Sequence, residues 1–476
     1  MRAIQMIRAL KRCRMVVICL CLLTLVPLYL SRGGLSYFQV VSDSYVQKLQ
    51  SQIFGLGRGC KANHSRESAD LLISIFRQKH GPDDSPYHLD DDVTYDTFIK
   101  RLRVGRIKGD TISKYFTIEG SAPWQRFQRN INQHFLYDPE DGTTLTDLLQ
   151  YLNKRTITHA ECNPLSSQLV LIFTFDDGGQ GVFKPMRNPR DYETKPDHFF
   201  FSDIERHTAE IAAFHLDKLL AYNRVPPTVG RVVNITRDIV QVGDQHIQKT
   251  AHRSPAGNFC FIGKCQDYCF HGNALCGSPH LIEGAVMAYL PHRKLNGTSN
   301  NVGNPWTRLY SPNSPNTWET DESFCETVVK PDTKFQGRLL LDIIDMAVLD
   351  FLTGNMDRHH FEKFDMFGDD TFILQYDNGR GFGKAKYDCL PCLAPVRQCC
   401  KIRLSTLAKL FKLYNGPDSL SQLLRTSLSS DPLAPILTEP HLDALDRRVG
   451  LVISTVYDCV NRTGSWDEVI VDDGVR

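Results

Sequence analysis

Gly354-Asn-Met-Asp-Arg-His-His-Phe-Glu362 and, further along, Asp377-Asn-Gly-Arg-Gly-Phe-Gly383 are the two motifs that decide the fold of this chain. Taken singly, Asp357 and Asp377 are ordinary residues for a solvated loop and a turn. The first motif, however, packs several charged side chains beside an apolar run, and charged groups in a cleft need a partner or a ligand. Together the motifs favour a functional site.

The residues around each motif predict where its aspartate lies. Apolar side chains of Leu339–Leu352 recur at helical spacing and Gly354 then ends the helix, so Asp357 falls in a loop just past a buried helix. The β-rich run Thr371–Tyr376 places Asp377 at a strand end. A protein kinase carries its catalytic base and its metal-binding aspartate in this same order: a helix, a loop with an aspartate, a strand, and an Asp-x-Gly-like turn.

The first motif departs from the ordinary protein-kinase signature. Met356 and Arg358 stand where His-Arg-Asp-Leu has Arg and Leu, and Glu362 replaces the second metal-binding Asn. The chain has no Gly-x-Gly-x-x-Gly loop and no Walker A motif, and Gly178-Gly179-Gln180-Gly181 is too short to predict phosphate binding. The kinase interpretation therefore depends on the two aspartate motifs.

The composition is that of an ordinary globular protein. The 476 residues are 42% hydrophobic and 23% charged, which fits one two-lobed domain with a stem. Lys and Arg number 55 against 54 Asp and Glu, so the net charge gives no support for nucleic acid as the general partner. Any selectivity for charged ligands must be local.

The N-terminus carries the pattern of a secretory targeting segment. A basic stretch over residues 1–14 precedes the charge-free apolar run Met15–Leu30. As a helix this run would span about 24 Å, against about 30 Å for a hydrocarbon core, and thin early-secretory membranes accept such a length. No clean small-x-small cleavage site follows. We therefore expect a type II membrane anchor, with a cleaved signal as the alternative.

Cysteines and glycosylation sequons agree with an oxidising compartment. Cys13, Cys19 and Cys21 belong to the targeting segment, which leaves twelve of the fifteen cysteines, an even number that permits complete pairing. For the cysteines of Asn258–Gly277 a zinc site is the alternative, but a lumenal setting favours disulfides. Asn-x-Ser/Thr sequons stand at Asn63, Asn234, Asn296 and Asn461.

A further pair of candidate residues lies upstream. Gln168–Phe175 and Val182–Pro185 predict a β-hairpin around a glycine turn, with Lys184 on the second strand. Ser202 and Glu205 precede a predicted helix and fit a capping box. Alternatively, Lys184 and Glu205 repeat the strand lysine and helix glutamate of kinases. The spacing alone favours neither interpretation of Glu205.

Six motifs together carry a specific family resemblance. They are Phe183-Lys-Pro-Met, Phe201-Ser-Asp-x-Glu-Arg-His, Ala209-Glu-Ile-Ala-Ala-Phe-His-Leu-Asp, the two aspartate motifs, and Gln398-Cys-Cys. From about Trp124 to about Val469 the chain closely resembles the Golgi casein kinase family, secretory-pathway protein kinases that phosphorylate Ser-x-Glu sites. The resemblance implies an α+β, atypical protein-kinase-like two-lobed fold that is stapled by disulfides, with a β-rich N-lobe and a helical C-lobe.

The resemblance also implies how the chain is divided into parts and which cofactors it binds. The expected parts are a cytosolic tail (1–14), an anchor or signal (15–31), a stem and N-terminal segment (32–110), an N-lobe (111–290) and a C-lobe (291–476). ATP with Mn²⁺, or with Mg²⁺ in its place, is implied between the lobes. The apolar run Ile282–Leu290 suits a strand that leads into the hinge.

The resemblance also implies roles for individual residues. Asp357 is implied as the catalytic base, and Glu205 and Asp377 as metal ligands. The implied nucleotide contacts are Gln168, Lys184, Met287, Ala288, Tyr289, Leu290, Glu362 and Asp377. The implied disulfides are Cys260–Cys276, Cys265–Cys269, Cys325–Cys399 and Cys400–Cys459.

Relatives within this family supply the alternative functions. One phosphorylates xylose in the proteoglycan linker, and its metal motif is closer to Asp-Asn-Ala-Lys-Ser-Phe-Gly than to Asp377–Gly383 of this chain. Another is a pseudokinase that lacks the glutamate equivalent to Glu205 and acts as an allosteric partner. We therefore expect a protein kinase of secreted acidic substrates in the Golgi lumen, either anchored or cleaved and secreted. It is expected to form a homodimer, or a heterodimer with a pseudokinase relative.

Two features stay open at the level of sequence. Cys389 and Cys392 form Cys-Leu-Pro-Cys just after the metal motif, and they pair either with each other or with Cys60 or Cys162. A basic face is predicted to dock acidic substrates, with a merely solvated surface as the commoner alternative. It comprises Lys384, Lys386, Arg397, Lys401 and Arg403.

Overall fold

The computed structural model describes residues 109–138, 141–195, 203–291, 300–309 and 314–472, all of which belong to the unit Leu72–Arg476. The predicted tail, the anchor and nearly all of the stem lie outside the described residues, as do Asn63, Asn296 and Cys60. Among the residues described, no helix combines the length and apolar character that a membrane crossing requires.

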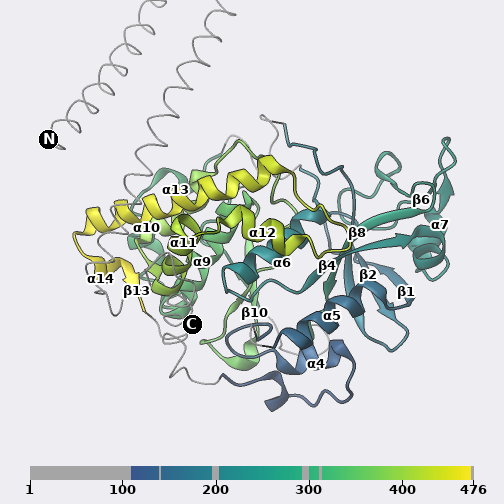
Figure 1. The fold of residues 1–476 in the computed structure, drawn as a ribbon, viewed down its shortest axis with the longest axis horizontal. Coiled ribbons are helices and arrows are strands. Elements are labelled where there is room, and N and C mark those ends of the chain that lie inside the picture. The colour runs from purple at the N-terminus through teal and green to yellow at the C-terminus, as the bar shows by residue number, and fades with distance from the viewer. Residues whose placement is uncertain (1–108, 139–140, 196–202, 292–299, 310–313, 473–476) are drawn as a thin grey trace, which may run out of the picture. The chain divides into compact units, whose positions relative to one another are not determined.

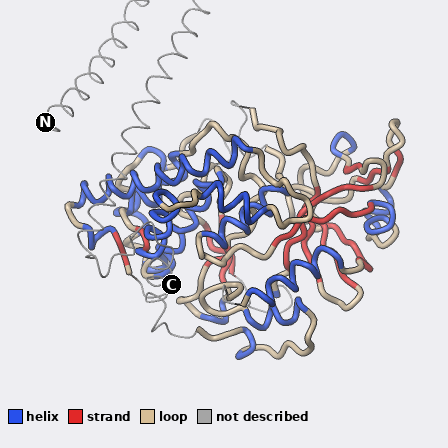
Figure 2. Tube along the Cα trace, in the orientation of Figure 1, coloured by secondary structure: helices blue, strands red, loops and turns tan. Residues whose placement is uncertain are grey.

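A five-stranded antiparallel sheet forms the N-terminal lobe (Figures 1 and 2). Its strand order is β1-β2-β3-β8-β4, with bounds Ile157–Cys162, Leu171–Phe175, Gln180–Pro185, Leu281–Ala288 and Thr228–Asn234. β2 and β3 form the predicted hairpin, in which Gly178 takes a φ of 81° at the turn. Side chains alternate along β3, so Phe183 packs on Phe173 in the core while Lys184 faces the other side of the sheet.

Helices cover this sheet and connect it to the rest of the chain. α5 (Gly142–Lys154) contacts β4 and β8, and α4 (Pro123–Asn130) packs against α5. α6 (His207–Leu219) also contacts β4 and β8, but it reaches α9 and α12 of the second lobe as well. Because it touches both lobes, α6 is buried along nearly its whole length. A small sheet at the far end of the lobe joins β5 (His252–Arg253), β6 (Phe259–Phe261) and β7 (Leu275–Cys276), next to α7 (Gln245–Thr250).

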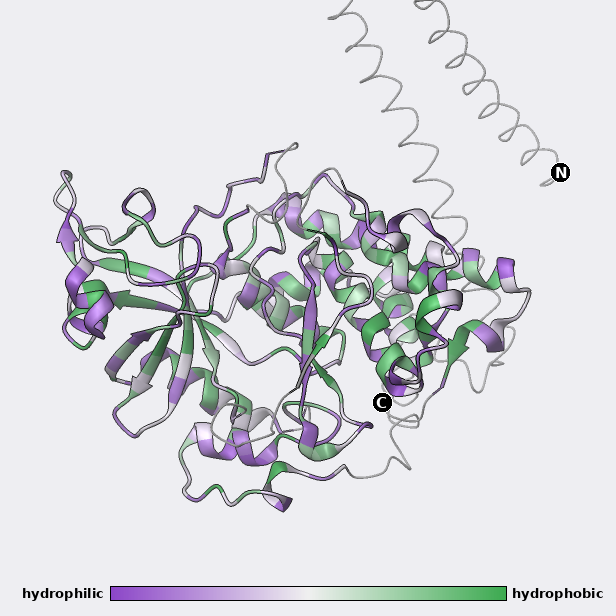
Figure 3. Cartoon of the chain, turned by 180° about the vertical axis from the view of Figure 1, so that it is seen from behind, coloured by the Kyte–Doolittle hydropathy of each residue, from purple (hydrophilic) through white to green (hydrophobic). Residues whose placement is uncertain are grey.

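The second lobe is mainly helical and is built around α9 (Arg338–Thr353), which contacts α6, α10 and α13. Gly354 ends α9 with a left-handed φ of 72°, as the sequence predicted. Figure 3 shows hydrophobic residues gathered where the helices pack together. The other principal helices are α10 (Ala394–Cys399), α11 (Leu404–Asn415), α12 (Leu420–Leu428), α13 (Glu439–Thr463) and α14 (Trp466–Val469).

Short strands complete the second lobe. β10 (His360–Lys363) pairs with β9 (Asn300–Gly303) on one side and β11 (Ile373–Leu374) on the other, while β12 (Ile402–Arg403) pairs with β13 (Ile470–Val471). β11 is shorter than the run Thr371–Tyr376 that the sequence predicted as a strand, because it pairs with β10 over only two residues. The fold class is nevertheless confirmed: a β-rich lobe precedes a helical lobe.

Five disulfides staple the part of the chain that the structure describes. The four expected pairs, Cys260–Cys276, Cys265–Cys269, Cys325–Cys399 and Cys400–Cys459, are each joined. A fifth bond joins Cys389 to Cys392, and Cys162 is a buried free cysteine. Of the sequons within the described residues, Asn461 is exposed near the end of α13 and Asn234 is half-buried at the end of β4.

A network of buried charges lies inside the helical lobe. Asp342 and Asp345 of α9 are fully buried, and Arg224 and Arg403 lie against both of them. Thr406 Oγ1 also donates a hydrogen bond to Asp345 at 2.6 Å. Arg403 therefore does not belong to the predicted basic docking face, because its guanidinium is enclosed in the core as the partner of two carboxylates.

Replacing Asp345 by Ala should lower the free energy of unfolding by about 3–5 kcal/mol, because the arginines keep their charge while one of their buried partners is lost. Chemical denaturation of the purified protein measures the change. Asp369→Ala is the matched control, since that carboxylate is fully exposed and is expected to shift stability by less than about 0.5 kcal/mol. Equal stability of the two variants would show that the network contributes nothing.

Candidate active site

The ammonium group of Lys184 lies among three carboxylates. Its Nζ is 3.0 Å from Glu205 Oε2, 2.6 Å from Glu210 Oε1 and 2.6 Å from Asp377 Oδ1. Oxygens of the three acids come within 4.8 Å of one another. The four side chains come from β3, the segment before α6, α6 itself and the turn after β11, so the cluster joins the two lobes.

Glu210 is the functional candidate that the sequence reasoning missed. It lies on α6 with a side chain that is 0% exposed, and both of its oxygens accept hydrogen bonds from the backbone N–H of Asn378. α6 begins at His207 with Arg206 as its N-cap, so Glu205 precedes the helix. The capping box, one of the two interpretations of Glu205 that the sequence left open, is therefore wrong. The kinase-like pair of strand lysine and helix glutamate is thus Lys184 with Glu210. A carboxylate inside the apolar run of Ala209–Phe214 was the signal that could have found it.

Glu205 reaches the cluster because the neighbouring backbone leaves room for it. A Cβ at Gly379 would lie 2.8 Å from Glu205 Cβ, so glycine is required at that position of the Asp377 turn. The N–H of Glu205 donates to Gln168 Oε1 at 3.2 Å, and Gln168 Nε2 donates to the carbonyl of Asp203 at 3.2 Å. The structure thus places Gln168, expected as a nucleotide contact, behind Glu205 as its support.

The electrostatics of the cluster favour a bound cation. Burial lowers the pKa of Lys184, but Asp377, Glu205 and Glu210 outweigh it and hold the pKa well above 10.5. Burial raises the pKa of Asp377, yet Lys184 reverses the effect and the pKa is lowered, while for Glu205 burial prevails and the pKa is raised. With every group ionised, three carboxylates against one ammonium leave two negative charges. This oxygen-rich set with excess negative charge fits a divalent ion such as Mn²⁺ or Mg²⁺.

A cavity of about 350 Å³ adjoins the cluster. Its apolar wall includes Val170, just before β2, and Ile172 and Val182 of the sheet. Its edge is the predicted hinge Met287–Leu290. Lys184, Glu362 and Asp377 line its polar side, together with two residues that the sequence reasoning missed, His360 and Tyr376. Tyr376 donates its hydroxyl to Glu362 Oε1 at 2.7 Å. The size and the mixed lining suit a nucleotide-sized ligand.

The β1–β2 loop closes this cavity where ordinary kinases have a glycine-rich loop. Asn163, Leu165 and Ser166 line the cavity, and the carbonyl of Ser166 accepts from the N–H of Gln266 at 2.9 Å. Gln266 lies in the short loop closed by the Cys265–Cys269 disulfide. The disulfide-closed loop therefore supports the β1–β2 loop, which forms the wall of the cavity in place of a glycine-rich loop.

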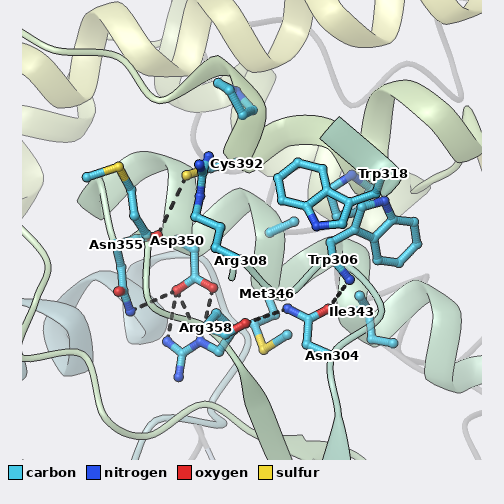
Figure 4. A pocket seen from close by; sticks show the side chains of 14 residues that line it. Asn304, Trp306, Arg308, Trp318, Ile343, Met346, Asp350, Asn355, Arg358 and Cys392 are labelled. Carbon is cyan, nitrogen blue, oxygen red and sulfur yellow. Dashed lines mark hydrogen bonds and ion pairs between the residues drawn. The ribbon is translucent and has the colours of Figure 1, made fainter. Parts of the chain in front are cut away.

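The loop that carries Asp357 is held from several sides (Figure 4). Asn355 Oδ1 accepts from the N–H of Asp357 at 3.0 Å. The guanidinium of Arg358 pairs with Asp350 of α9 at 2.8 Å and donates to Asn378 Oδ1 at 2.7 Å. Arg358, a departure from the usual kinase signature, thus ties the Asp357 loop to both α9 and the turn of Asp377.

Asp357 itself lies between two basic side chains. Arg380 Nη1 is 2.5 Å from Asp357 Oδ2, and the ring of His359 is 3.7 Å from Oδ1, where its pKa is raised chiefly by the aspartate. Oδ1 is buried, and no donor in the described part of the chain forms a hydrogen bond with it. One oxygen is therefore fixed by Arg380 while the other can accept a proton.

A sheet lobe and a helical lobe that meet at a lysine, a helix glutamate and a turn aspartate define a protein-kinase-like fold. A family profile described as "Golgi casein kinase, C-terminal, Fam20" matches residues 122–468. The chain belongs to this family.

Relatives of similar sequence support this family assignment. The chain is 46% identical to the Drosophila melanogaster protein "Extracellular serine/threonine protein CG31145", over 72% of this chain and 65% of that protein. It is also 46% identical to human "Extracellular serine/threonine protein kinase FAM20C", over 75% of this chain but only 60% of that protein. Human "Pseudokinase FAM20A" (43%) and "Glycosaminoglycan xylosylkinase" (35%) are relatives too.

Solved structures give the same fold. A crystal structure of the Golgi casein kinase with Mn/ADP bound superimposes with a TM-score of 0.74 at 39% identity, covering 81% of this chain and 91% of that chain. The structure of hydra Fam20 with sugar gives a TM-score of 0.69 at 35% identity, over 74% of this chain and 99% of that chain. The family is thus one of secretory kinases that also contains pseudokinases and a sugar kinase.

Replacing Glu210 by Gln should weaken Mn²⁺ binding by roughly tenfold or more, because one of three clustered carboxylates is lost. Titration calorimetry of the purified protein with Mn²⁺ measures the affinity. Glu326→Gln is the control, since Glu326 is exposed and pairs only locally with Lys330. An unchanged affinity in Glu210→Gln would exclude Glu210 from the metal site.

Proposed function

We propose that this protein is a secretory-pathway serine/threonine kinase that transfers the γ-phosphate of ATP to Ser-x-Glu sites of secreted proteins. The observation that carries the proposal is the cluster of Lys184 with three carboxylates, which adjoins a nucleotide-sized cavity. Arg358 ties the loop of Asp357 to Asn378, next to this cluster. Phosphoryl transfer needs little covalent chemistry from a protein, so positioning and charge stabilisation are the main requirements.

Each group has a role in this proposal. The hinge Met287–Leu290 and Glu362 line the cavity and would contact the nucleotide, while Lys184 would lie against the phosphates. Glu205, Glu210 and Asp377 would hold Mn²⁺, which supplies electrostatic stabilisation of the charge on the transferring phosphoryl group.

Asp357 is the proposed base. Its Oδ1 would accept the proton of the substrate hydroxyl as the oxygen attacks phosphorus. Arg380 keeps Oδ2 engaged and thereby fixes the orientation of the carboxylate. The ring of His359 lies 3.7 Å from Oδ1, where a charge on the imidazole would bear on that proton transfer.

Two observations support this function over its alternatives. The chain has Glu205 at the cluster, whereas a pseudokinase is expected to lack that carboxylate. Arg380 pairs with the proposed base. It belongs to the motif Asp377–Gly383, whose sequence is the one expected of the protein kinases rather than of the xylose kinase. Location in the Golgi lumen, a membrane anchor that is retained or cleaved, and pairing with a pseudokinase relative are part of the same proposal.

Incubation of the purified lumenal part with labelled ATP, Mn²⁺ and either a Ser-x-Glu peptide or a xylosylated acceptor tests the activity. We expect label on the peptide, and a loss of kcat of roughly 10²–10⁴-fold in Asp357→Asn because the base is removed. Asp370→Asn, in an exposed turn, is the control. Label on the sugar alone, or on neither acceptor, would overturn the proposal, and full activity of Asp357→Asn would overturn the assignment of the base.

The same assay tests the metal preference. Glu362 stands where ordinary kinases have a neutral Asn, which adds negative charge to the cavity and should favour Mn²⁺. We therefore expect activity with Mg²⁺ alone to fall below that with Mn²⁺, and the difference to shrink in Glu362→Gln. Equal activity of the wild-type protein with both metals would exclude this role.

A further inference from the structure

The disulfide between Cys389 and Cys392 closes a very short loop. Its cysteines are 3 residues apart in the sequence, against 74 for Cys325–Cys399 and 59 for Cys400–Cys459. In the chain-entropy account, a disulfide stabilises a fold by restricting the unfolded chain, and the effect grows with the length of the closed loop. The Cys389–Cys392 bond therefore contributes less to stability than the other two bonds of the helical lobe, and its surroundings point to a different role.

The two sulfurs of this bond differ in how easily they can be reached. Cys389 is 0% exposed, whereas Cys392 is half-buried. Leu390 and Pro391, which lie between them, are exposed. A disulfide is exchanged when a thiolate attacks one of its two sulfurs. An incoming thiolate can therefore reach Cys392 more easily than Cys389.

The surroundings of Cys389 favour its departure in such an attack. Arg308 Nη2 lies 3.6 Å from Cys389 Sγ, while Nη1 of the same guanidinium pairs with Glu319 at 3.0 Å. Attack on Cys392 expels Cys389 as a thiolate, and a neighbouring guanidinium stabilises that charged form. Because a stabilised thiolate leaves faster, Arg308 assists exchange at the sulfur that is the more exposed of the two.

The backbone keeps the two cysteines together without the covalent bond. The N–H of Cys392 donates to the carbonyl of Cys389 at 2.8 Å, within the turn that leads into the 3₁₀ helix Leu390–Leu393. This hydrogen bond does not depend on the S–S bond. After reduction the two thiols are therefore held near each other and can be oxidised again, which makes the site reversible.

Cys392 lies directly behind the loop of the proposed base. Its sulfur is 3.7 Å from the carbonyl oxygen of Asn355 (Figure 4). The side chain of Asn355 accepts from the N–H of Asp357 at 3.0 Å and donates to Asp350 at 3.4 Å. Reduction would release Cys392 from its covalent tether and thus change the support behind Asn355.

The other end of the disulfide is fixed by charge. Asp388, which precedes Cys389, pairs with Arg447 at 2.8 Å and with Arg448 at 3.1 Å. Arg448 also donates to the carbonyl of Leu352 in α9 at 2.7 Å. Cys389 is therefore held whether or not the bond is present. Of the two cysteines, Cys392 is the one whose position depends on the disulfide.

We propose that the Cys389–Cys392 pair is a thiol–disulfide exchange site that controls the neighbouring kinase centre. This inference rests on the proposed function and adds a means of regulating it. The disulfide form is the active form, because it holds Cys392 against the loop of Asp357.

The reductant of this site is a dithiol. Its first thiolate bonds to Cys392 Sγ as the Cys389–Cys392 bond breaks, and Cys389 leaves as a thiolate that then takes up a proton. The second thiolate of the dithiol attacks the reductant's own sulfur in the mixed disulfide and releases Cys392 as a thiolate, which is protonated in turn. Two electrons thus pass from the dithiol, which becomes a disulfide, to the protein.

The first experiment measures which sulfur reacts, independently of kinase activity. Cys389→Ser leaves Cys392 as a single thiol, and Cys392→Ser leaves Cys389. Mass spectrometry follows mixed-disulfide formation with oxidised glutathione, and we expect Cys392 to react roughly tenfold faster or more, because it is the more exposed. In urea the two rates should become similar. Equal rates in the folded variants, or a faster reaction at Cys389, would overturn Cys392 as the point of attack.

The second experiment measures the effect on catalysis. The wild-type protein is treated with dithiothreitol, which is removed before assay with ATP, Mn²⁺ and a Ser-x-Glu peptide. We expect kcat to fall by roughly fivefold or more, because small displacements of a catalytic group are costly, and oxidised glutathione to restore it. Mass spectrometry should show the other four disulfides intact.

Two double variants complete this experiment. Cys389→Ser/Cys392→Ser should have the activity of the reduced protein and give no response to dithiothreitol. Cys265→Ser/Cys269→Ser is the matched control, since it also lacks a short-loop disulfide and should keep the wild-type response. Thermal denaturation establishes that each variant is folded.

Three results would overturn the inference. They are a kcat that reduction of the Cys389–Cys392 bond leaves unchanged, a response to dithiothreitol that persists in Cys389→Ser/Cys392→Ser, and a Cys389–Cys392 bond that is reduced only together with the other four. A wild-type protein without kinase activity in either redox state would overturn the proposed function and the regulation with it. The glutathione experiment still decides, in that case, whether exchange takes place at Cys392.

Discussion

The ion cluster at Lys184 is the interaction on which the rest of the structure depends. One ammonium group holds carboxylates from three separate segments, and two of these, the residues before α6 and the turn after β11, have little regular structure of their own. Lys184, Glu205 and Glu210 are largely buried, and buried charges are stable only when their partners are in place. The cluster therefore fixes how the sheet lobe meets the helical lobe, and the nucleotide-sized cavity follows from that position.

A second set of polar contacts extends this constraint into the helical lobe. α9 is apolar over most of its surface, but it presents Asp350 to Arg358 and thereby anchors the loop of Asp357. Nearer the start of α9, Asp342 and Asp345 pair with Arg224, which lies between α6 and β4, and with Arg403 of β12. The proposed base is thus carried by a helix that is itself fixed at several points by charge.

The sequence predicted those parts that follow from local patterns. Helical spacing and Gly354 located the end of α9, alternation located the hairpin that carries Lys184, and the order of the two aspartate motifs indicated a kinase-like cleft. Local patterns failed where pairing over long distances decides. Glu210 looks like an ordinary residue of a helix until Asn378, more than a hundred residues away, is seen to donate to it. Arg403 of β12 looks exposed in the sequence because its acidic partners belong to α9, far away along the chain.

Asp377 shows how easily a protein of this fold can lose catalysis and keep its structure. Its φ is 61°, a left-handed conformation that Asn and Asp tolerate far better than most residues do. An exchange of Asp for Asn at this position would remove the charge of a proposed metal ligand and preserve the backbone of the turn. Because this backbone conformation tolerates Asn as well as Asp, a single substitution at Asp377 can yield a folded protein without kinase activity. The family includes proteins named as pseudokinases.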